Sequence, residues 1–216
     1  MADAPSFTGP DGRPRCWWCA GAPELTAYHD TEWGFAVTDD RRLFEKIYLE
    51  GFQAGLSWLT ILRKREAFRS GFAGFDFERV ARFGAKDVAR LLGDAGIVRH
   101  RGKIESAINN ARRACDLVAE CGSLAAYLRR FEPPAASRPK RITLDVLRTL
   151  TTCPESVALS KDLKRRGWSF VGPTTMYAFM QAMGLVNDHT DGCCIRSAAE
   201  RSRRAARRPA PGVPNP

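Results

Sequence analysis

Apolar residues recur at helical spacing along most of the chain. The clearest case is the segment 39–51, in which Leu43, Phe44 and Ile47 share one face of an amphipathic helix. Glu50 follows Ile47 by three residues, so the pattern places its carboxylate toward the buried side at the end of this helix. An exposed C-terminal glutamate is the alternative, and the negative end of the helix dipole argues against it.

Helical spacing continues through the middle of the chain. A second amphipathic helix is expected within residues 52–72, and a string of helices over residues 86–131 that is broken at Gly96 and Gly122. The Pro-rich, polar segment 132–141 is expected to be a loop. Strict alternation of apolar and polar residues, which marks a half-buried strand, is found nowhere. The sequence therefore predicts an all-α protein.

A helix, a glycine-bounded turn and a second helix are predicted over residues 156–184. The first helix ends near Arg166, and the turn runs from Gly167 to Gly172. Pro173 follows at the first position of the second helix, where its missing N–H is not needed. Glycines let the backbone approach a ligand, and a helix N-terminus offers free N–H groups to an anion such as a DNA phosphate. A compact helix–helix turn without a ligand is the other interpretation.

The two ends of the chain differ from its body. The 216 residues suffice for one domain or two small lobes, and the apolar content of 44% is that of a globular protein. The net charge is +10, which is compatible with a polyanionic partner. Residues 196–216 contain six Arg and one Glu, so we expect a disordered basic tail there. We expect a mobile leader over residues 1–14 and the folded domain over residues 15–195.

Targeting signals and membrane spans are not expected. The first residues lack the apolar core of a signal peptide, and no run of about 18 apolar residues occurs. Cysteines without a secretion signal favour reduced thiols, perhaps with a metal, over disulfides. The seven cysteines are Cys16, Cys19, Cys115, Cys121, Cys153, Cys193 and Cys194. We therefore expect a cytoplasmic protein without membrane contact, and a monomer as the default.

Two pairs of residues suggest a metal site. His189 and Cys193 are four residues apart, and Cys16 precedes His29 by thirteen residues. Two cysteines and two histidines are a normal ligand set for a tetrahedral structural zinc ion. Cys19 and Cys194 could replace their neighbours, and two unrelated pairs without metal are the other possibility. A shared zinc ion would hold the irregular, aromatic-rich segment 15–34 to the C-terminal end of the domain.

Several long segments, in order, resemble the bacterial DNA-3-methyladenine glycosylase I family over residues 15–195. They read RCWW, AYHDTEWG, LFEKIYLEGFQAGLSWLTILRKRE, DAGIVRHRGKI, SKDLKRRGWSFVGPTTMYAFMQAMGLVNDH and GCC. The resemblance implies an all-α, helix–hairpin–helix DNA glycosylase-like fold with one structural zinc per chain. The zinc ligands it implies are Cys16, His29, His189 and Cys193. The base-pocket residues it implies are Tyr28, Glu50 and Trp58, with Trp18 and Trp33 nearby. Leu25 stands where the family has a pocket tyrosine.

The turn resembles the helix–hairpin–helix of a DNA glycosylase superfamily. This resemblance assigns the DNA backbone to the turn and its flanks: Lys164, Arg166, Gly167, Ser169, Gly172 and Thr174. Much of that superfamily has a catalytic Asp where this chain has Asn187. Asn lacks a full negative charge, so we expect an enzyme that depends on a labile substrate. No Lys lies in the hairpin to form a Schiff base, so we expect no lyase step.

The implied activity is base-excision repair of double-stranded DNA that contains alkylated purines. The enzyme would hydrolyse the N-glycosidic bond of 3-methyladenine and leave an abasic site. Methylation at N3 makes adenine cationic, so an aromatic face such as Trp58, with Tyr28, and a buried carboxylate, Glu50, would both favour it. Whether Glu50 is a chemical base or a recognition residue stays open. Gln53 and Leu56 are candidates to fill the gap left by the flipped base.

Two other functions are compatible with parts of the pattern. A helix–hairpin–helix protein that binds DNA without chemistry would need the turn but not Glu50, Tyr28 and Trp58. A metal-dependent hydrolase would use the Cys and His residues, although four protein ligands leave no open coordination position. Abasic-site formation in alkylated DNA, with and without a chelator, separates these functions.

Overall fold

The computed structural model describes residues 7–207 and is mostly helical in that range. A single antiparallel pair, β1 (Phe7–Thr8) and β2 (Pro14–Arg15), is the only sheet among the described residues. The expected helical class is therefore confirmed, with this short hairpin as an addition. The chain divides into two compact units. Within the described range, unit 1 comprises residues 7–38, 133–150 and 181–207, and unit 2 comprises residues 39–132 and 151–180.

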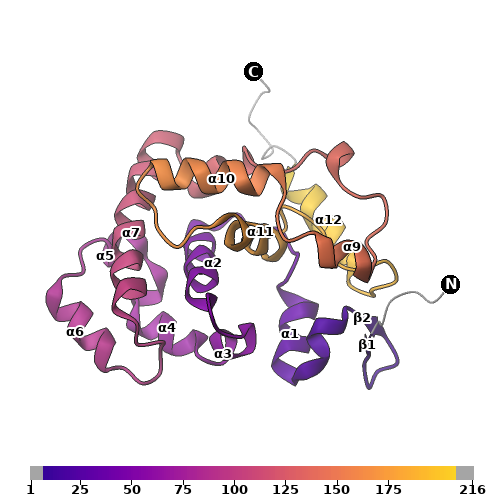
Figure 1. Ribbon diagram of the computed structural model, residues 1–216, viewed down its shortest axis with the longest axis horizontal. Helices are drawn as coiled ribbons and strands as arrows, with labels where there is room; N and C mark the ends of the chain where they lie inside the picture. Colours follow the sequence, from indigo (N-terminus) through magenta and orange to yellow (C-terminus); the bar gives the residue numbers. More distant parts are fainter. Residues whose placement is uncertain (1–6, 208–216) are drawn as a thin grey trace. The chain divides into compact units, whose positions relative to one another are not determined.

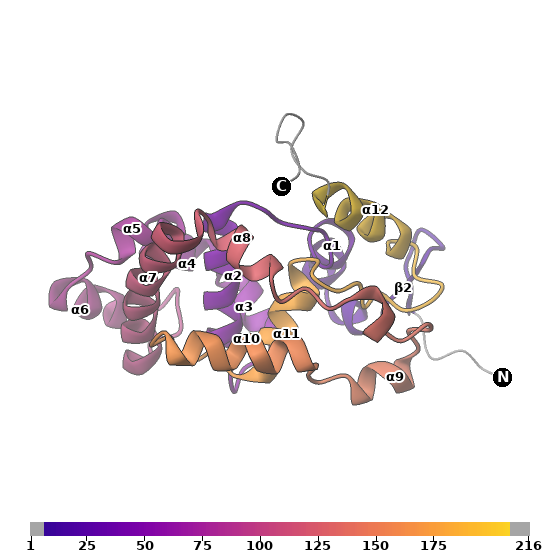
Figure 2. The ribbon, with the colours of Figure 1, turned by 90° about the horizontal axis from the view of Figure 1, so that it is seen from above.

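Unit 2 is built around one buried helix, α2 (Asp40–Gln53), which lies against α3, α7 and α8 (Figures 1 and 2). Every residue from Leu43 to Phe52 is buried, so both the apolar stripe and the polar residues between its members lie inside. The other elements of unit 2 are α3 (Trp58–Arg63), α4 (Arg65–Gly71), η2 (Ala73–Phe75), α5 (Phe77–Val80), α6 (Ala85–Gly93), α7 (Arg101–Cys121), α8 (Leu124–Arg129), α10 (Pro154–Arg165) and the first eight residues of α11 (Pro173–Ala182).

An aromatic cluster on α2 and the helices after it forms the core of unit 2. The Tyr48 ring lies 4.4 Å from that of Phe52 and 4.8 Å from that of Phe72, measured between centroids. Phe68 closes the cluster at 4.9 Å from Phe52. Tilted and edge-on aromatic pairs at these distances add to the free energy gained by burying their area. This core fixes the C-terminal half of α2.

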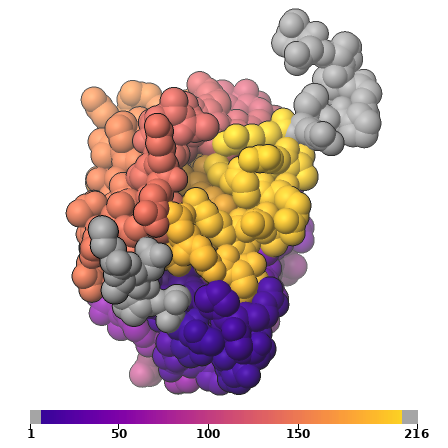
Figure 3. All heavy atoms as spheres, turned by 90° about the vertical axis from the view of Figure 1, so that its right-hand side faces the viewer, coloured from indigo at the N-terminus to yellow at the C-terminus, as the bar shows by residue number. Residues whose placement is uncertain are grey.

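Unit 1 is assembled from three separate stretches of sequence. Its elements are β1, β2, η1 (Trp17–Gly21), α1 (Pro23–Thr31), η3 (Ala135–Ser137), α9 (Leu144–Thr149), the end of α11 and α12 (Arg196–Arg207). The first and last stretches lie side by side, indigo and yellow in Figure 3. Backbone hydrogen bonds join them, from Gly34 to the Ala182 carbonyl at 3.1 Å and from Cys194 to the Pro14 carbonyl at 2.9 Å.

Gly184 ends the turn after α11, and its conformation explains why a glycine is needed there. Its φ is +72°, in the left-handed region that favours glycine. An added Cβ would lie 2.6 Å from the backbone nitrogen of Ala36, too close for any side chain. The same residue lets the first and last stretches of unit 1 approach each other.

Three expectations about the chain ends need correction. The segment 15–34 was expected to be irregular, but it holds η1 and the nine-residue helix α1. Residues 196–207 of the expected disordered tail form α12, because Ala199 is buried and Arg203 donates to the carbonyls of Gly184 and Leu185 at 2.7 and 2.8 Å. Residues 7–8 and 14–15 of the expected leader are paired strands. Residues 1–6 and 208–216 lie outside the described range.

The single helix expected within residues 52–72 is a fourth correction, because the structure has two helices there, α3 and α4, which meet at Lys64. Other predicted helix boundaries agree with the structure. The helix predicted over residues 156–166 is α10, and the second helix of the turn begins at Pro173 as expected. Gly122, with φ of +82°, ends α7. Within residues 7–207 no helix combines the length and apolar character needed to cross a membrane.

Candidate metal centre and candidate base site

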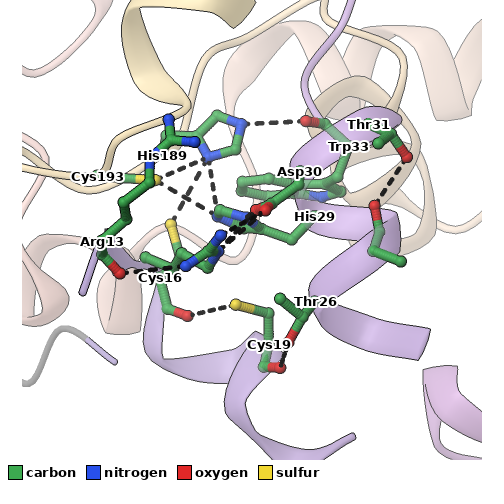
Figure 4. A network of polar contacts seen from close by, with 12 residues as sticks. Arg13, Cys16, Cys19, Thr26, His29, Asp30, Thr31, Trp33, His189 and Cys193 are labelled. Atoms are coloured by element: carbon green, nitrogen blue, oxygen red, sulfur yellow. Dashed lines mark hydrogen bonds and ion pairs between the residues drawn. The ribbon is translucent and has the colours of Figure 1, made fainter. Parts of the chain in front are cut away.

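Four side chains of unit 1 converge on one buried point (Figure 4). Cys16 lies just before η1, His29 is on α1, and His189 and Cys193 flank the turn before α12. Their ligand atoms all lie within 4.8 Å of one another, and all four residues are buried. Cys19 and Cys194 are outside this cluster, and the Cys19 thiol instead donates to the Cys16 carbonyl at 3.0 Å.

The distances within the cluster fit a tetrahedral metal ion. Bonds of about 2.0 Å to nitrogen and about 2.3 Å to sulfur, at tetrahedral angles, put two nitrogens about 3.3 Å apart and nitrogen and sulfur about 3.6 Å apart. In the structure the Nδ1 of His189 lies 3.2 Å from the Nε2 of His29 and 3.7 Å from the Sγ of Cys16. The Sγ of Cys193 lies 3.4 Å from the Nε2 of His29 and 3.5 Å from the Nδ1 of His189. The cluster could therefore hold a metal ion.

Both histidines are held by a partner at their other ring nitrogen. The Nδ1–H of His29 donates to Asp30 at 2.8 Å, and the Nε2–H of His189 donates to the Trp33 carbonyl at 3.0 Å. Arg15 in turn holds Asp30 at 2.8 Å. These partners orient the rings and leave Nε2 of His29 and Nδ1 of His189 as acceptors, as in metal sites with ordered outer shells.

The two cysteines of the cluster shift each other's pKa in opposite directions. The hydrogen bond from Cys16 lowers the pKa of Cys193, with further lowering by the two histidines. The same hydrogen bond, together with burial, raises the pKa of Cys16 well above that of a free thiol. One thiolate is thus already favoured in this cluster, and thiolates are the form that binds metals.

Gly34 makes room for His189. Its φ of +84° favours glycine, and an added Cβ would lie 2.9 Å from the Nε2 of this histidine. The glycine therefore permits the close approach that lets the histidine reach the Trp33 carbonyl.

The aromatic residues predicted in and near the base pocket lie beside the Cys–His cluster within unit 1. The Trp18 ring lies 5.1 Å from Trp33 and 5.4 Å from His29, and Trp33 lies 4.7 Å from His189. Tyr28 is buried on α1, with its ring 6.3 Å from that of Trp18. Trp18 and Trp33 thus cover the histidines, a contact that sequence reasoning did not anticipate.

The second group of candidates lies in unit 2, at the end of α2 and the start of α3. Glu50 is buried, as its helical position predicted, with 7% of its side chain exposed. Its carboxylate forms an ion pair of 2.7 Å with Lys46, one turn earlier on α2 and equally buried. The Lys46 ammonium also lies 3.3 Å from the centroid of the half-buried Trp58 ring. A carboxylate and an aromatic face therefore hold one cation between them.

Sequence reasoning missed Lys46. The signal was present, since lysine and glutamate four residues apart face each other on a helix. A surface pair is the usual meaning of that spacing, and only the burial of all of α2 from Leu43 to Phe52 makes this pair internal.

The turn between α10 and α11 is held from within unit 2 by two asparagines of α7. Asn110, which is buried, donates to the Ser169 carbonyl at 2.9 Å and accepts from the Ser169 N–H at 3.0 Å. Asn109 donates to the Gly167 carbonyl at 2.7 Å. The turn also passes close to α2, because an added Cβ at Gly51 would lie 3.3 Å from Phe170. The turn is thus a rigid part of unit 2.

The other residues predicted to bind the DNA backbone differ in their exposure and in their ion pairs within the protein. Lys164 and Thr174 are exposed, and Gly172 is half-buried beside the first turn of α11. That first turn carries no acidic residue. Arg166, by contrast, is held by Asp162 at 2.8 Å and by Glu120 at 2.9 Å. Its guanidinium ties α10 to α7 in this structure.

Two positions where the chain departs from the expected pattern lie in unit 1. The Asn187 amide donates to the Arg196 carbonyl at 3.1 Å and to Glu200 at 3.4 Å, so it connects the turn after α11 to α12. Leu25 is half-buried on α1.

A family model of methyladenine glycosylases matches residues 18–197, which include nearly the whole of both groups of candidates. The chain belongs to the methyladenine glycosylase family. Among curated members, DNA-3-methyladenine glycosylase 1 of Escherichia coli K12 is 48% identical over 180 residues, which cover 83% of this chain and 95% of that protein. The DNA-3-methyladenine glycosylase of Haemophilus influenzae is 44% identical, covering 85% of this chain and 98% of that protein.

Solved structures of methyladenine glycosylases share the fold. A crystal structure of 3-methyladenine DNA glycosylase I matches with a TM-score of 0.77 at 48% identity, covering 83% of this chain and 98% of that one. The Staphylococcus aureus enzyme, whose recognition of 3-methyladenine has been described structurally, matches with a TM-score of 0.77 at 34% identity, covering 84% and 96%. The resemblance inferred from the sequence motifs is therefore confirmed.

Proposed function

We propose that this methyladenine glycosylase excises 3-methyladenine from double-stranded DNA and leaves an abasic site. The observation that carries the proposal is that the buried Glu50 and the half-buried Trp58 hold a positive charge between them. The relatives named as DNA-3-methyladenine glycosylases, at 44–48% identity over most of their length, support the same reaction.

The charge of the substrate explains why these two side chains suit it. Methylation at N3 gives the adenine of DNA a positive charge and weakens its bond to deoxyribose. An aromatic face attracts a cation by about 0.5–2 kcal/mol, depending on how far both are desolvated. A buried carboxylate prefers a charged partner still more strongly, because a neutral one does not offset the cost of its burial. Neutral adenine gains less from both groups.

The reaction then needs little additional chemistry. The nucleotide is extruded from the duplex, since the bond cannot be reached inside the stack. When the glycosidic bond breaks, the cationic base keeps both bonding electrons and leaves neutral, and water adds to the sugar with loss of a proton. Glu50 stabilises the bound cation and orients it. The base-binding roles that the family resemblance implies for Tyr28, Trp18 and Trp33 stay predictions.

We propose that the Cys16, His29, His189 and Cys193 cluster holds one zinc ion with a structural role. The two-sulfur, two-nitrogen donor set and the tetrahedral spacing support this ion. Four protein ligands leave no position for water or substrate, so the metal is not assigned a step in the reaction. When bound, zinc supplies a cross-link between the first and last stretches of unit 1.

We propose that the turn from Gly167 to Gly172 and the start of α11 bind the DNA backbone as a helix–hairpin–helix. The rigid turn and the helix N-terminus without acidic neighbours support a phosphate at this place. The exposed Lys164 and Thr174 are assigned to the same contact. Arg166 is assigned a structural role, because its guanidinium is paired with Asp162 and Glu120. Leu56, which is 41% exposed between α2 and α3, is proposed to fill the gap left by the flipped base.

The enzyme is proposed to be monofunctional, to act as a monomer and to work in the cytoplasm. The hairpin contains no lysine for a Schiff base, which argues against a lyase step. Asn187 provides no carboxylate to stabilise a sugar cation, which restricts the enzyme to bases with weakened bonds.

A base-release assay tests the proposed function. Alkylated duplex DNA is incubated with the protein, and the freed bases are identified by chromatography. We expect release of 3-methyladenine, formation of abasic sites without strand cleavage, and no release of undamaged adenine. A protein that binds alkylated duplexes tightly without releasing any base would instead be a DNA-binding module, and the proposed function would be wrong.

A further inference from the structure

The position of Lys46 has a consequence for how the proposed base site works. Its ammonium lies 2.7 Å from the Glu50 carboxylate and 3.3 Å from the centre of the Trp58 ring. These are the two groups to which the proposed function assigns the alkylated base. A ring stacked on Trp58 would also approach its face to about 3.5 Å, the ordinary contact distance of carbon atoms. The ammonium and the base therefore compete for the same place.

We propose that the Lys46 ammonium occupies the binding position of the alkylated base in the free protein and is displaced when the base binds. This inference rests on the proposed function. Lysine is suited to the task, because its charge sits at the end of a flexible four-carbon stem. Its displacement exchanges one cation for another, so neither Glu50 nor the face of Trp58 is left without positive charge.

The exchange sets a threshold for entry into the site. The interactions that an incoming base forms with the site must be at least as favourable as those that Lys46 loses. This requirement reduces the apparent affinity of every ligand. A cationic purine restores both the ion pair and the cation–π contact. A neutral purine restores neither, so it does not replace the lysine. Lys46 is in this sense a specificity-determining residue, and not a catalytic one.

The position of Lys46 also explains how the free protein tolerates a buried carboxylate at Glu50. A carboxylate with only 7% exposure is costly to bury unless it is paired. Lys46 supplies that pairing until the substrate arrives. The ion pair thus lets Glu50 stay buried and ionised when no ligand is bound.

The test compares Lys46→Met with Lys86→Met, which removes one exposed lysine charge from α6 in the same unit. The probe is the 3,9-dimethyladeninium ion, which keeps its positive charge at neutral pH because both N3 and N9 carry methyl groups, and its affinity is measured by titration calorimetry. We expect Lys46→Met to bind the probe at least about tenfold more tightly than the unaltered protein, because the internal competitor is gone. We expect Lys86→Met to bind it as the unaltered protein does. Unchanged or weaker binding by Lys46→Met would overturn the proposal.

A second measurement uses the unaltered protein and does not depend on how the variant folds. The Cε protons of a lysine over an indole face are shifted upfield by the ring current. We expect one such signal in the spectrum of ¹³C-lysine-labelled protein, absent in Lys46→Arg, to move to the ordinary lysine position when the probe saturates the site. A signal that stays upfield in the complex would mean that Lys46 is not displaced.

The outcomes separate this inference from the proposed function. If the unaltered protein releases 3-methyladenine from DNA while the Lys46 signal and the affinity of Lys46→Met stay unchanged, only the displacement is wrong. If the unaltered protein releases no base from alkylated DNA, the proposed function fails whatever Lys46 does.

Discussion

Glu50 and Glu45 form a natural pair for testing which buried carboxylate of α2 recognises the base. Both are buried on the same helix and both are ion-paired, Glu50 with Lys46 at 2.7 Å and Glu45 with Arg69 at 2.8 Å. Glu50 shares its cation with the face of Trp58. The two residues therefore carry similar structural costs but different proposed roles.

We expect Glu50→Gln to lower the rate of 3-methyladenine release by about 10–100-fold, the loss that follows when a charged hydrogen bond becomes a neutral one. We expect Glu45→Gln to stay within about twofold of the unaltered enzyme. Release rates and unfolding temperatures are measured for both variants, so that a loss of stability is recognised. An unchanged rate and unchanged base selectivity in Glu50→Gln would remove this residue from the site.

Single residues show where the sequence was informative and where it was not. The burial of Glu50 followed from its spacing to Ile47, because helical geometry alone decides which residues share a face. The roles of Asn109 and Asn110 did not follow, since their partners at Gly167 and Ser169 are almost sixty residues away. Pairing over such distances depends on the tertiary fold, which periodicity does not report.

Among the elements, the helices with a stripe of buried aliphatic residues were predictable, and the helices without such a stripe were not. The sequence predicted α2 because Leu43, Phe44 and Ile47 repeat at helical spacing. It did not predict α1, whose buried residues are Tyr28 and His29 in place of an aliphatic stripe. It also did not predict α12, in which Arg203 is buried by bonding to the carbonyls of Gly184 and Leu185. An arginine used in this way is indistinguishable in sequence from a solvated one.

The N-terminus of α11 allows a test in which the altered helix should be at least as stable as the original. Asp in place of the exposed Thr174 adds a negative charge to the first turn, which favours a helix by about 0.3–1 kcal/mol. The same charge repels a phosphate bound there. We expect Thr174→Asp to bind duplex DNA with an abasic-site analogue about tenfold more weakly, with a salt dependence reduced by about one ion.

The matched control for Thr174→Asp is Ala85→Asp, which adds the same charge to the exposed first turn of α6. We expect this variant to keep the DNA affinity of the unaltered protein. Equal affinities for Thr174→Asp and Ala85→Asp would show that the α11 N-terminus is not a phosphate site, and that the turn serves only to connect two helices.

For the chain as a whole, the decisive contact is the one that joins residues far apart in sequence within unit 1. Cys16 and His29 lie near one end of the chain, and His189 and Cys193 lie near the other. A metal ion bound by all four closes a loop of more than 150 residues, and it stabilises the folded state by the free energy of binding. The stability of unit 1 should therefore depend on the proposed zinc ion.

Adjacent cysteines provide the means to test this dependence. Cys193 belongs to the cluster, whereas Cys194 only packs against it. We expect the purified protein to contain about one zinc ion per chain, Cys193→Ser to lose it, and Cys194→Ser to keep it. Loss of about 3–5 kcal/mol lowers the unfolding temperature of a domain of this size by about 6–20 °C. Treatment with a chelator should reproduce the shift in the unaltered protein but add little to Cys193→Ser. Metal content by atomic absorption and unfolding by calorimetry decide the matter, because equal zinc content in the two variants would show that these four residues do not form the metal site.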